Sequence, residues 1–126
     1  MAQNIENIEL EPLKPHVLKN QIDYVSQTIV TRYILKKTTG HVSLYALDKD
    51  ETLIAREVAH DHLIQILEGC AEVMINGQVR KLQVGQIVVI PAHAPNTIRA
   101  VDRLKMIVTL IPSGYEEFHV ENPSSS

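Results

Sequence analysis

The sequence predicts an all-β domain, a sandwich or barrel of short antiparallel strands. Short runs rich in β-branched residues recur along the chain, and Gly, Pro and Asn-Gly turn signals separate them. Hydrophobic residues make up 44% of the chain, aromatic residues only 4%, and Trp is absent, so the core must be aliphatic. The central part of the chain shows no helical periodicity of useful length.

Nine segments are expected to be strands: 28–36, 42–47, 52–59, 63–67, 71–75, 78–82, 87–90, 97–101 and 105–111. Asn76-Gly77 predicts a type I′ hairpin turn, whose twist matches that of the flanking strands. Gly69 and Gly85 stand where tight turns are expected to need positive φ. Pro91 is expected to end a strand, because proline has no amide hydrogen to donate to a neighbouring strand.

The length of 126 residues is enough for one domain and too short for two. Residues 1–20 are polar and contain two prolines, so we expect an N-terminal arm. Residues 21–112 carry the strand pattern and should form the domain. Residues 113–126 end in three serines and are expected to be a loose C-terminal tail.

The charge balance excludes several classes of partner. The formal net charge is −3, and no cluster of Lys and Arg is long enough for a nucleic-acid face. No apolar run approaches the ~20 residues of a membrane span, and the N-terminus lacks a signal-peptide pattern. The single cysteine, Cys70, fits a reducing compartment and is expected to be a small buried apolar side chain. We therefore expect a soluble, cytoplasmic protein.

Three segments together resemble a known family. They read Leu-Glu-Gly at 67–69, Val-Met-Ile-Asn-Gly at 73–77 and Leu-Gln-Val-Gly-Gln-Ile-Val-Val-Ile-Pro at 82–91. Over residues 22–111 the chain resembles the small single-domain cupins. The resemblance implies a double-stranded β-helix, the jelly-roll-like β-barrel of the cupins, and it implies a homodimer.

The positions that hold the metal in a typical cupin are altered in this chain. The family binds a divalent metal through two or three His and one Glu that point into the cup. The matching positions carry Arg56, Val58, His62 and Asn96. Arginine stays protonated and is not a normal metal ligand. The resemblance therefore does not carry the usual ligand set over to this chain.

Nearby histidines offer a relocated metal site. His62 should point inward by the register of the family, and His60 shares that face if the strand extends back to it. With His93 they form a three-histidine set suited to Fe, Mn, Ni or Zn, with positions left open for substrate. The other interpretation is that these are polar residues at the rim of the barrel. Asp61 either accepts hydrogen bonds from backbone amides of a turn, which we favour, or orients a histidine.

Arg56 supports a different interpretation of the cup. An inward guanidinium matches a carboxylate or phosphate, so with Asn96 and His62 it could bind a small anion without a metal. The alternative is a structural ion pair. The remaining histidines, His16, His41 and His119, are expected at the surface. The expected lining of the ligand pocket is Arg56, Val58, His62, Ile64, Ile66, Val88, Ile90, Asn96 and Ile98.

Three functions follow from these patterns. The first is a small-molecule-binding cupin whose ligand is unassigned, acting as a sensor or carrier. The second is a metal-dependent enzyme of the dioxygenase or isomerase type, built on the relocated histidine site. The third is an interaction module whose aliphatic outer strands pair face to face. The fold alone does not choose among them.

Overall fold

The computed structural model describes residues 2–6, 9–55 and 59–112 of the chain. All nine predicted strands are present within these ranges, with boundaries moved by a few residues; most of the second half of the strand predicted at 52–59 lies outside the described residues. Within the described ranges the elements are β1 (Ala2–Glu6), the 3₁₀ helix η1 (Leu18–Asn20), β2 (Thr28–Lys37), β3 (Gly40–Leu47), β4 (Thr52–Ala55), β5 (His60–Glu68), β6 (Cys70–Ile75), β7 (Gln78–Gln83), β8 (Ile87–Ile90), β9 (Asn96–Ala100) and β10 (Leu104–Pro112).

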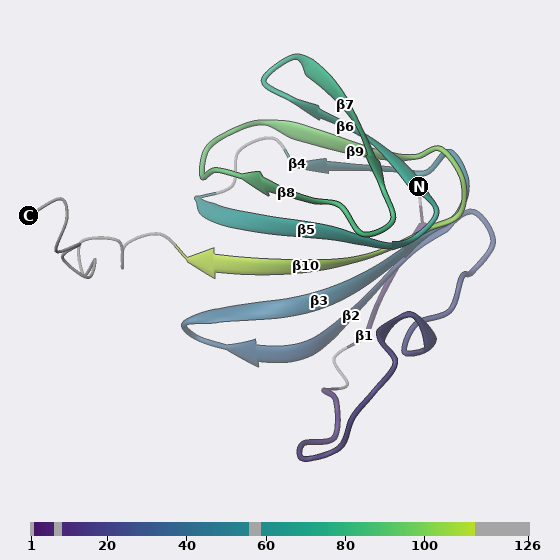
Figure 1. Cartoon of the computed structure of the whole chain (residues 1–126), viewed down its shortest axis with the longest axis vertical. Helices are drawn as coiled ribbons and strands as arrows, with labels where there is room; N and C mark the ends of the chain where they lie inside the picture. Colours follow the sequence, from purple (N-terminus) through teal and green to yellow (C-terminus); the bar gives the residue numbers. More distant parts are fainter. Residues whose placement is uncertain (1, 7–8, 56–58, 113–126) are drawn as a thin grey trace, which may run out of the picture.

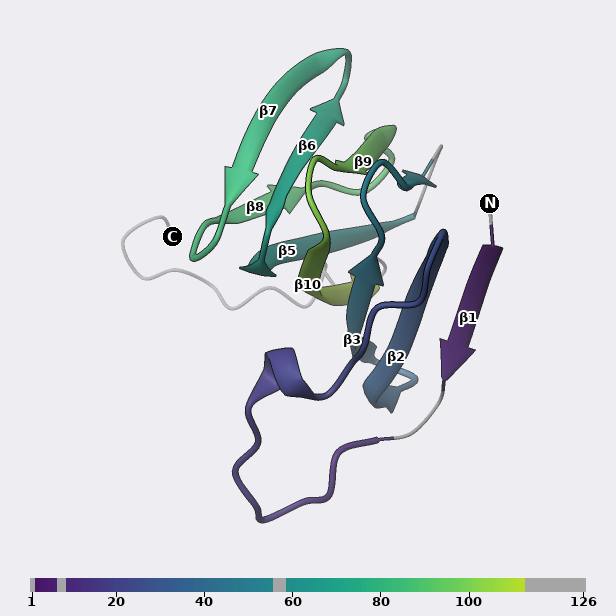
Figure 2. The same ribbon diagram turned by 90° about the vertical axis from the view of Figure 1, so that its right-hand side faces the viewer.

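The strands form two sheets that face each other (Figures 1 and 2). The larger sheet has the order β1-β2-β3-β10-β5-β8, and the smaller has the order β4-β9-β6-β7. Apart from the β1–β2 pair, neighbouring strands within each sheet are antiparallel. The predicted all-β class is therefore confirmed. The described residues contain no helix long and apolar enough to span a membrane.

The start of the predicted N-terminal arm is a strand. Residues Ala2–Glu6 pair in parallel with β2, from Ala2 opposite Thr28 to Glu6 opposite Arg32. Without β1, the outer edge of β2 would present unpaired amide and carbonyl groups, which edge strands in proteins rarely leave uncovered. This strand was not predicted, because residues 2–6 lack an alternating apolar pattern.

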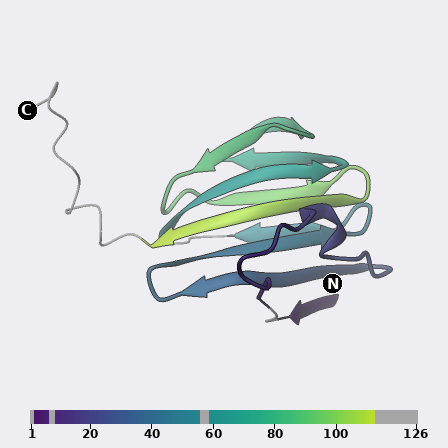
Figure 3. The ribbon, with the colours of Figure 1, turned by 60° about the horizontal axis from the view of Figure 1, so that its bottom comes forward.

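The segment between β1 and β2 covers part of the outer face of the larger sheet (Figure 3). The hydroxyl of Tyr24 donates a 2.6 Å hydrogen bond to Oε2 of Glu68, and Nζ of Lys105 donates a 2.6 Å bond to the carbonyl of Lys19. These contacts hold the segment on a second apolar cluster, whose buried members are Ile22, Val30, Ile34, Leu44 and Ala46.

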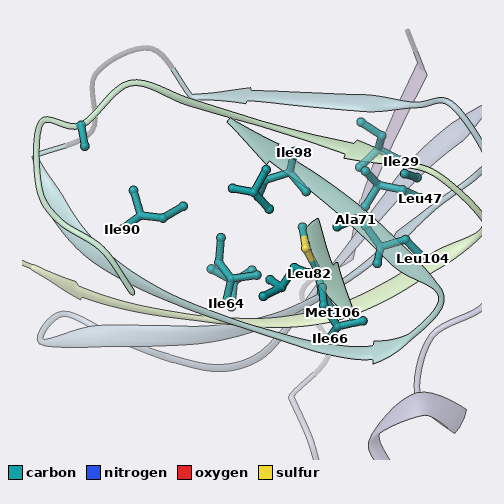
Figure 4. Close-up of a cluster of buried hydrophobic side chains, with 14 residues drawn as sticks. Ile29, Leu47, Ile64, Ile66, Ala71, Leu82, Ile90, Ile98, Leu104 and Met106 are labelled. Atoms are coloured by element: carbon teal, nitrogen blue, oxygen red, sulfur yellow. The ribbon is translucent and has the colours of Figure 1, made fainter. Parts of the chain in front are cut away.

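The main core lies between the two sheets (Figure 4). Inward residues alternate along each strand, so both sheets contribute one face. The core is almost wholly aliphatic, as the composition required. It comprises Ile29, Leu47, Ile64, Ile66, Ala71, Val73, Leu82, Ile90, Ala94, Ile98, Ala100, Leu104, Met106 and Val108.

The expected turn geometry is present at the glycines. Asn76 and Gly77 both have positive φ, 50° and 79°, as a type I′ turn requires. Gly69, between β5 and β6, has φ 85°, and a Cβ there would lie 2.0 Å from the carbonyl oxygen of Arg103. This glycine therefore allows the turn between β9 and β10 to approach the chain more closely than any side chain permits.

We predict that Gly69→Ala strongly destabilises the protein while Gly85→Ala does so weakly. Gly85 has a nearly identical φ of 86° but open space where its Cβ would be. Gly85→Ala should lower the free energy of unfolding by about 1 kcal/mol, because alanine disfavours positive φ. Gly69→Ala should add to this an overpacking cost of about 1–3 kcal/mol or more. Chemical denaturation of both variants measures the difference. Equal losses would contradict the close approach at Gly69.

Candidate functional site

A cavity of about 450 Å³ lies between the sheets, near the end where β3 begins and β10 ends. The strands β2, β3, β4, β5, β9 and β10 contribute its lining. At this end of the two sheets the side chains of the main core do not fill the space between them. The wall is made by Tyr33, His41, Tyr45, Leu53, Ile54, Ala55, His62, Ile64, Asn96, Ile98, Val108 and Leu110.

The wall on the larger sheet is arranged in rows across β3, β10 and β5. Leu110 lies opposite His41 on β3 and opposite His62 on β5. Residues that oppose each other in antiparallel strands project to the same face, so both imidazoles flank Leu110 on the inner face. The next row inward, Ser43–Val108–Ile64, is less polar. The polar end of the cavity is therefore built by two histidines that are 21 residues apart in the sequence.

The opposite wall, on the smaller sheet, is almost entirely apolar. It consists of Leu53, Ile54 and Ala55 on β4, with Asn96 and Ile98 on β9. Asn96 is buried because it shares the inward face of β9 with Ile98, and its Nδ2 donates a 3.1 Å hydrogen bond to the carbonyl of Ala94. A ligand in this cavity would meet polar groups mainly from the larger sheet.

The histidines of the cavity are held neutral. Burial lowers the pKa of His41, and the nearby charges of Lys36 and His60 lower it further. Burial also lowers the pKa of His62, an effect opposed by a hydrogen bond to the backbone of His60 and reinforced by the charges of His60 and His41. Burial raises the pKa of the Tyr45 hydroxyl. At neutral pH these side chains therefore offer uncharged hydrogen-bonding groups.

The wall around His41 contains polar atoms that the protein itself does not satisfy. The imidazole makes an edge-on contact with Tyr33, with ring centroids 5.0 Å apart, and Nζ of Lys36 lies 4.7 Å from the centroid of the tyrosine ring. In the described part of the chain, Nδ1 of His41 and Oγ of Ser43 are buried without a hydrogen-bond partner. Buried polar atoms without partners are uncommon in folded proteins and often mark functional regions.

The residues expected to line the ligand pocket do not all lie on its wall. His62, Ile64, Asn96 and Ile98 lie on the wall of the cavity. Ile66 and Ile90 do not: each is 1% exposed within the core. Ile66 lies in the row behind Val108, opposite Met106, whereas Ile90 on β8 lies beside His62 and packs into the main core.

Val88 also departs from the expected lining. It packs against the core and borders a separate hollow with Ile75 and Arg80, because β8 lies at the edge of the larger sheet. Arg56 and Val58 lie outside the described residues, so the structure does not bear on the anion site that Arg56 predicts.

The three histidines of the expected metal site are not brought together. His60 and His62 begin β5, but His93 is exposed in the loop after β8, with φ 69°. Among residues 2–6, 9–55 and 59–112, no group of three or more His, Cys, Asp or Glu side chains is placed to hold a metal ion. The described residues therefore do not fit the metal that the fold implies.

His41 is the residue of the cavity that sequence reasoning missed, since it was expected at the surface. The alternation along 41–47 puts Val42, Leu44 and Ala46 on the apolar face of the strand, which the sequence favours as the inner one. That apolar face packs in the second cluster on the outer side of the larger sheet, so the face with His41 turns toward the cavity instead.

Of the two roles considered for Asp61, the structure shows the hydrogen bond to a backbone amide of a turn: its Oδ1 accepts a 2.8 Å hydrogen bond from the amide of Ala92. This bond ties the loop after β8 to the start of β5.

Comparisons with known proteins rest on structure alone. No family model and no curated protein matches the chain. A conserved protein of unknown function from Streptococcus pyogenes superposes with a TM-score of 0.78 at 21% identity, over 85% of this chain and 94% of that one. The sequence signal is thus too weak for a family assignment, while the structural signal is strong.

Two further similar structures are of proteins described as cupins. A cupin superfamily protein from Desulfitobacterium hafniense superposes with a TM-score of 0.79 at 22% identity, covering 84% of this chain and 97% of that one. A cupin 2 conserved barrel domain protein from Leptotrichia buccalis gives 0.80 at 23% identity, over 92% of this chain and 57% of that one. The chain is therefore a small protein with the cupin fold.

Proposed function

We propose that the chain binds a small, largely apolar molecule in the cavity between the two sheets. The observation that carries the proposal is the division of the cavity wall, in which an aliphatic wall faces one that bears two histidines and two tyrosines. The volume of about 450 Å³ is in the range of pockets that hold small molecules.

The chemistry of the wall indicates the class of ligand. Leu53, Ile98 and Val108 offer contact to an apolar body. His41 and His62, neutral at pH 7, offer hydrogen bonds to an uncharged head such as a hydroxyl or an amide. A ligand with one apolar end and one polar end would match both walls at once.

An anionic ligand is the second form of the same proposal, and it depends on Arg56. A guanidinium at the end of β4 would add a fixed positive charge to a cavity whose described walls have none. A metal-dependent dioxygenase or isomerase stays a prediction, since the described residues do not supply a ligand set.

We predict that Leu110→Trp abolishes ligand binding and that Ile111→Trp does not. Leu110 lies on the cavity wall between His41 and His62, so the larger side chain fills the space. Ile111, the next residue, faces outward and is exposed. A fragment library of neutral alcohols and amides with their matched carboxylates, screened by ligand-observed NMR, provides the probes.

Fragments that bind the wild type should bind Leu110→Trp at least about tenfold more weakly. Equal binding to both variants, or no binding to the wild type at millimolar concentration, would refute the proposal. A preference for carboxylates over their neutral partners supports the contribution of Arg56. Repeating the screen with EDTA shows whether a metal ion takes part, since loss of binding would favour the metal-dependent alternative.

The neutral histidines predict a loss of stability on acidification. A histidine has an unfolded pKa of about 6.5, and burial lowers the folded pKa of both His41 and His62. Below about pH 6.5 the unfolded chain therefore binds more protons than the folded one, and unfolding becomes easier as the pH falls.

Between about pH 7.5 and pH 5.5, the Tm of the wild type should fall more than that of the double variant His41→Gln/His62→Gln. Differential scanning fluorimetry in a series of buffers measures both. A parallel decline in the two proteins would show that other groups cause the pH dependence.

A further inference from the structure

The described residues cover only part of the outer face of the larger sheet. Leu10, Leu18 and Tyr24 pack there against the second apolar cluster, which includes Ile34 and Leu44. In Figure 3 the segment between β1 and β2 lies over one part of the sheet, and the ends at which β3 begins and β10 stops extend beyond it. Within the described ranges, that end of the outer face therefore remains uncovered.

An apolar row crosses the uncovered end of the face. It runs over five neighbouring strands, from Leu35 on β2 through Val42 on β3, Thr109 on β10 and Leu63 on β5 to Val89 on β8. The two ends of this outer row, Leu35 and Val89, are 46% and 58% exposed. A contiguous apolar surface without a cover is typical of a site where another segment or molecule packs.

A groove of about 250 Å³ lies at the β2 end of the outer row. Leu35, Val42 and Thr109 line it, and Ile111, which is 51% exposed, extends the lining along β10. Lys37, at the end of β2, also lines the groove. The groove therefore combines an apolar floor with a positive charge.

The part of the chain that follows β10 starts beside this groove. β10, which contributes to the lining, ends at Pro112. The next residues, 113–121, lie outside the described ranges and read Ser-Gly-Tyr-Glu-Glu-Phe-His-Val-Glu. They carry three large apolar or aromatic side chains, Tyr115, Phe118 and Val120, which suit an apolar floor.

Length and charge both fit this segment to the groove. An extended chain covers about 3.3 Å per residue, so Phe118 can reach about 20 Å from the end of β10, whereas Leu35 lies two strands away, about 10 Å. Glu116 and Glu117 precede Phe118 and are opposite in charge to Lys37. A segment that packs its phenylalanine on the floor of the groove therefore brings its acidic residues to the lysine of the lining.

We propose that residues 113–121 fold back over the end of β10 and pack in the groove of their own chain, with Phe118 on the apolar floor and the two glutamates beside Lys37. The segment between β1 and β2 already covers the other part of this face in the same way. A second copy or another protein must find the groove from solution, whereas a segment joined to β10 is present at an effective concentration of about millimolar. This inference does not depend on the proposed ligand.

The packed segment also supports the wall of the cavity. His41 and Leu110 border both the groove and the cavity between the sheets. A side chain in the groove therefore lies against the far side of that wall and shields the ends of β3 and β10 from water.

The sequence contains no tryptophan, so a single introduced tryptophan is a specific optical probe. Phe118→Trp reports on the proposed contact, and Ser125→Trp, farther along the chain, is the matched control. Acrylamide quenching of the full chain follows the fraction of time for which each indole is exposed. If the segment is packed for about two thirds of the time or more, quenching of Phe118→Trp should be at most about a third of that of Ser125→Trp. Equal quenching overturns the proposal.

Substitutions in the groove test where the segment packs. Leu35→Ser, added to Phe118→Trp, should raise quenching to the level of Ser125→Trp, while Val79→Ser should leave it unchanged. Val79 is a matched control because it is 52% exposed on the smaller sheet, against 46% for Leu35. Protection that survives Leu35→Ser would place the segment elsewhere, and protection that falls on dilution would mean that a second copy fills the groove. Either outcome overturns the proposal.

The charge of Lys37 gives a second test of the same contact. Lys37→Glu, added to Phe118→Trp, should weaken the packing and raise quenching, because it places an acid beside the two glutamates. Lys81→Glu is the control, since Lys81 is an exposed lysine of β7 on the smaller sheet. Equal quenching in the two charge variants would contradict the placement of the glutamates beside Lys37.

Proteolysis checks the result on a chain without the tryptophan probe. A glutamate-specific protease cuts after Glu116 or Glu117 when the segment is free, so the rate of cleavage follows the free population. Leu35→Ser should therefore speed cleavage at least about threefold over the wild type, and Val79→Ser should not. Circular dichroism shows whether the variants fold, and Ile111→Ser tests the same floor if Leu35→Ser does not. Equal rates in the wild type and a folded groove variant would refute the proposal.

Discussion

The structure depends on the pairing of β10 between β3 and β5. This strand comes last among the described elements, and it joins two strands that the chain forms much earlier. Its register with each neighbour sets every inward row of the larger sheet. A shift of one residue on either side would turn His41 or His62 to the outer face, because successive side chains of a strand point in opposite directions.

The rows built on β10 also divide the interior into a filled end and an open end. The row Tyr45–Met106–Ile66 is large, and behind it Leu47 and Leu104 complete the core. Toward the other end, Ser43 and Val108 are smaller and leave space between the sheets. The position of the cavity thus follows from side-chain volume along three paired strands, within a fold that would otherwise pack to uniform density.

The cupin fold is retained while the residues that usually give it chemistry are not. Position 62 carries His and position 96 carries Asn, and both face the cavity as the resemblance implied for their positions. Their neighbours on the wall are His41, two tyrosines and aliphatic residues. A scaffold can keep its walls and change its ligand, because the strands that hold the walls do not depend on the identity of the inward polar residues.

Much of the fold was predictable because its signals are local. Asn76-Gly77 specifies its turn through two adjacent residues, and β-branched runs mark the strands regardless of what they pair with. β1 was missed because its stability comes from the edge of β2 rather than from its own pattern. His93 was placed in the site by proximity in sequence to Asn96, whereas the loop directs it to solvent.

The sequence by itself determined the strands, their turns, the aliphatic core and the inward positions of His62 and Asn96. Only the tertiary structure decided that His41 joins His62, that Ile66 and Ile90 belong to the core, and that Asp50 and Glu72 both pair with Arg99. The physical reason is that strand alternation is a property of neighbouring residues, whereas register joins residues far apart in the chain and is settled only when whole sheets assemble.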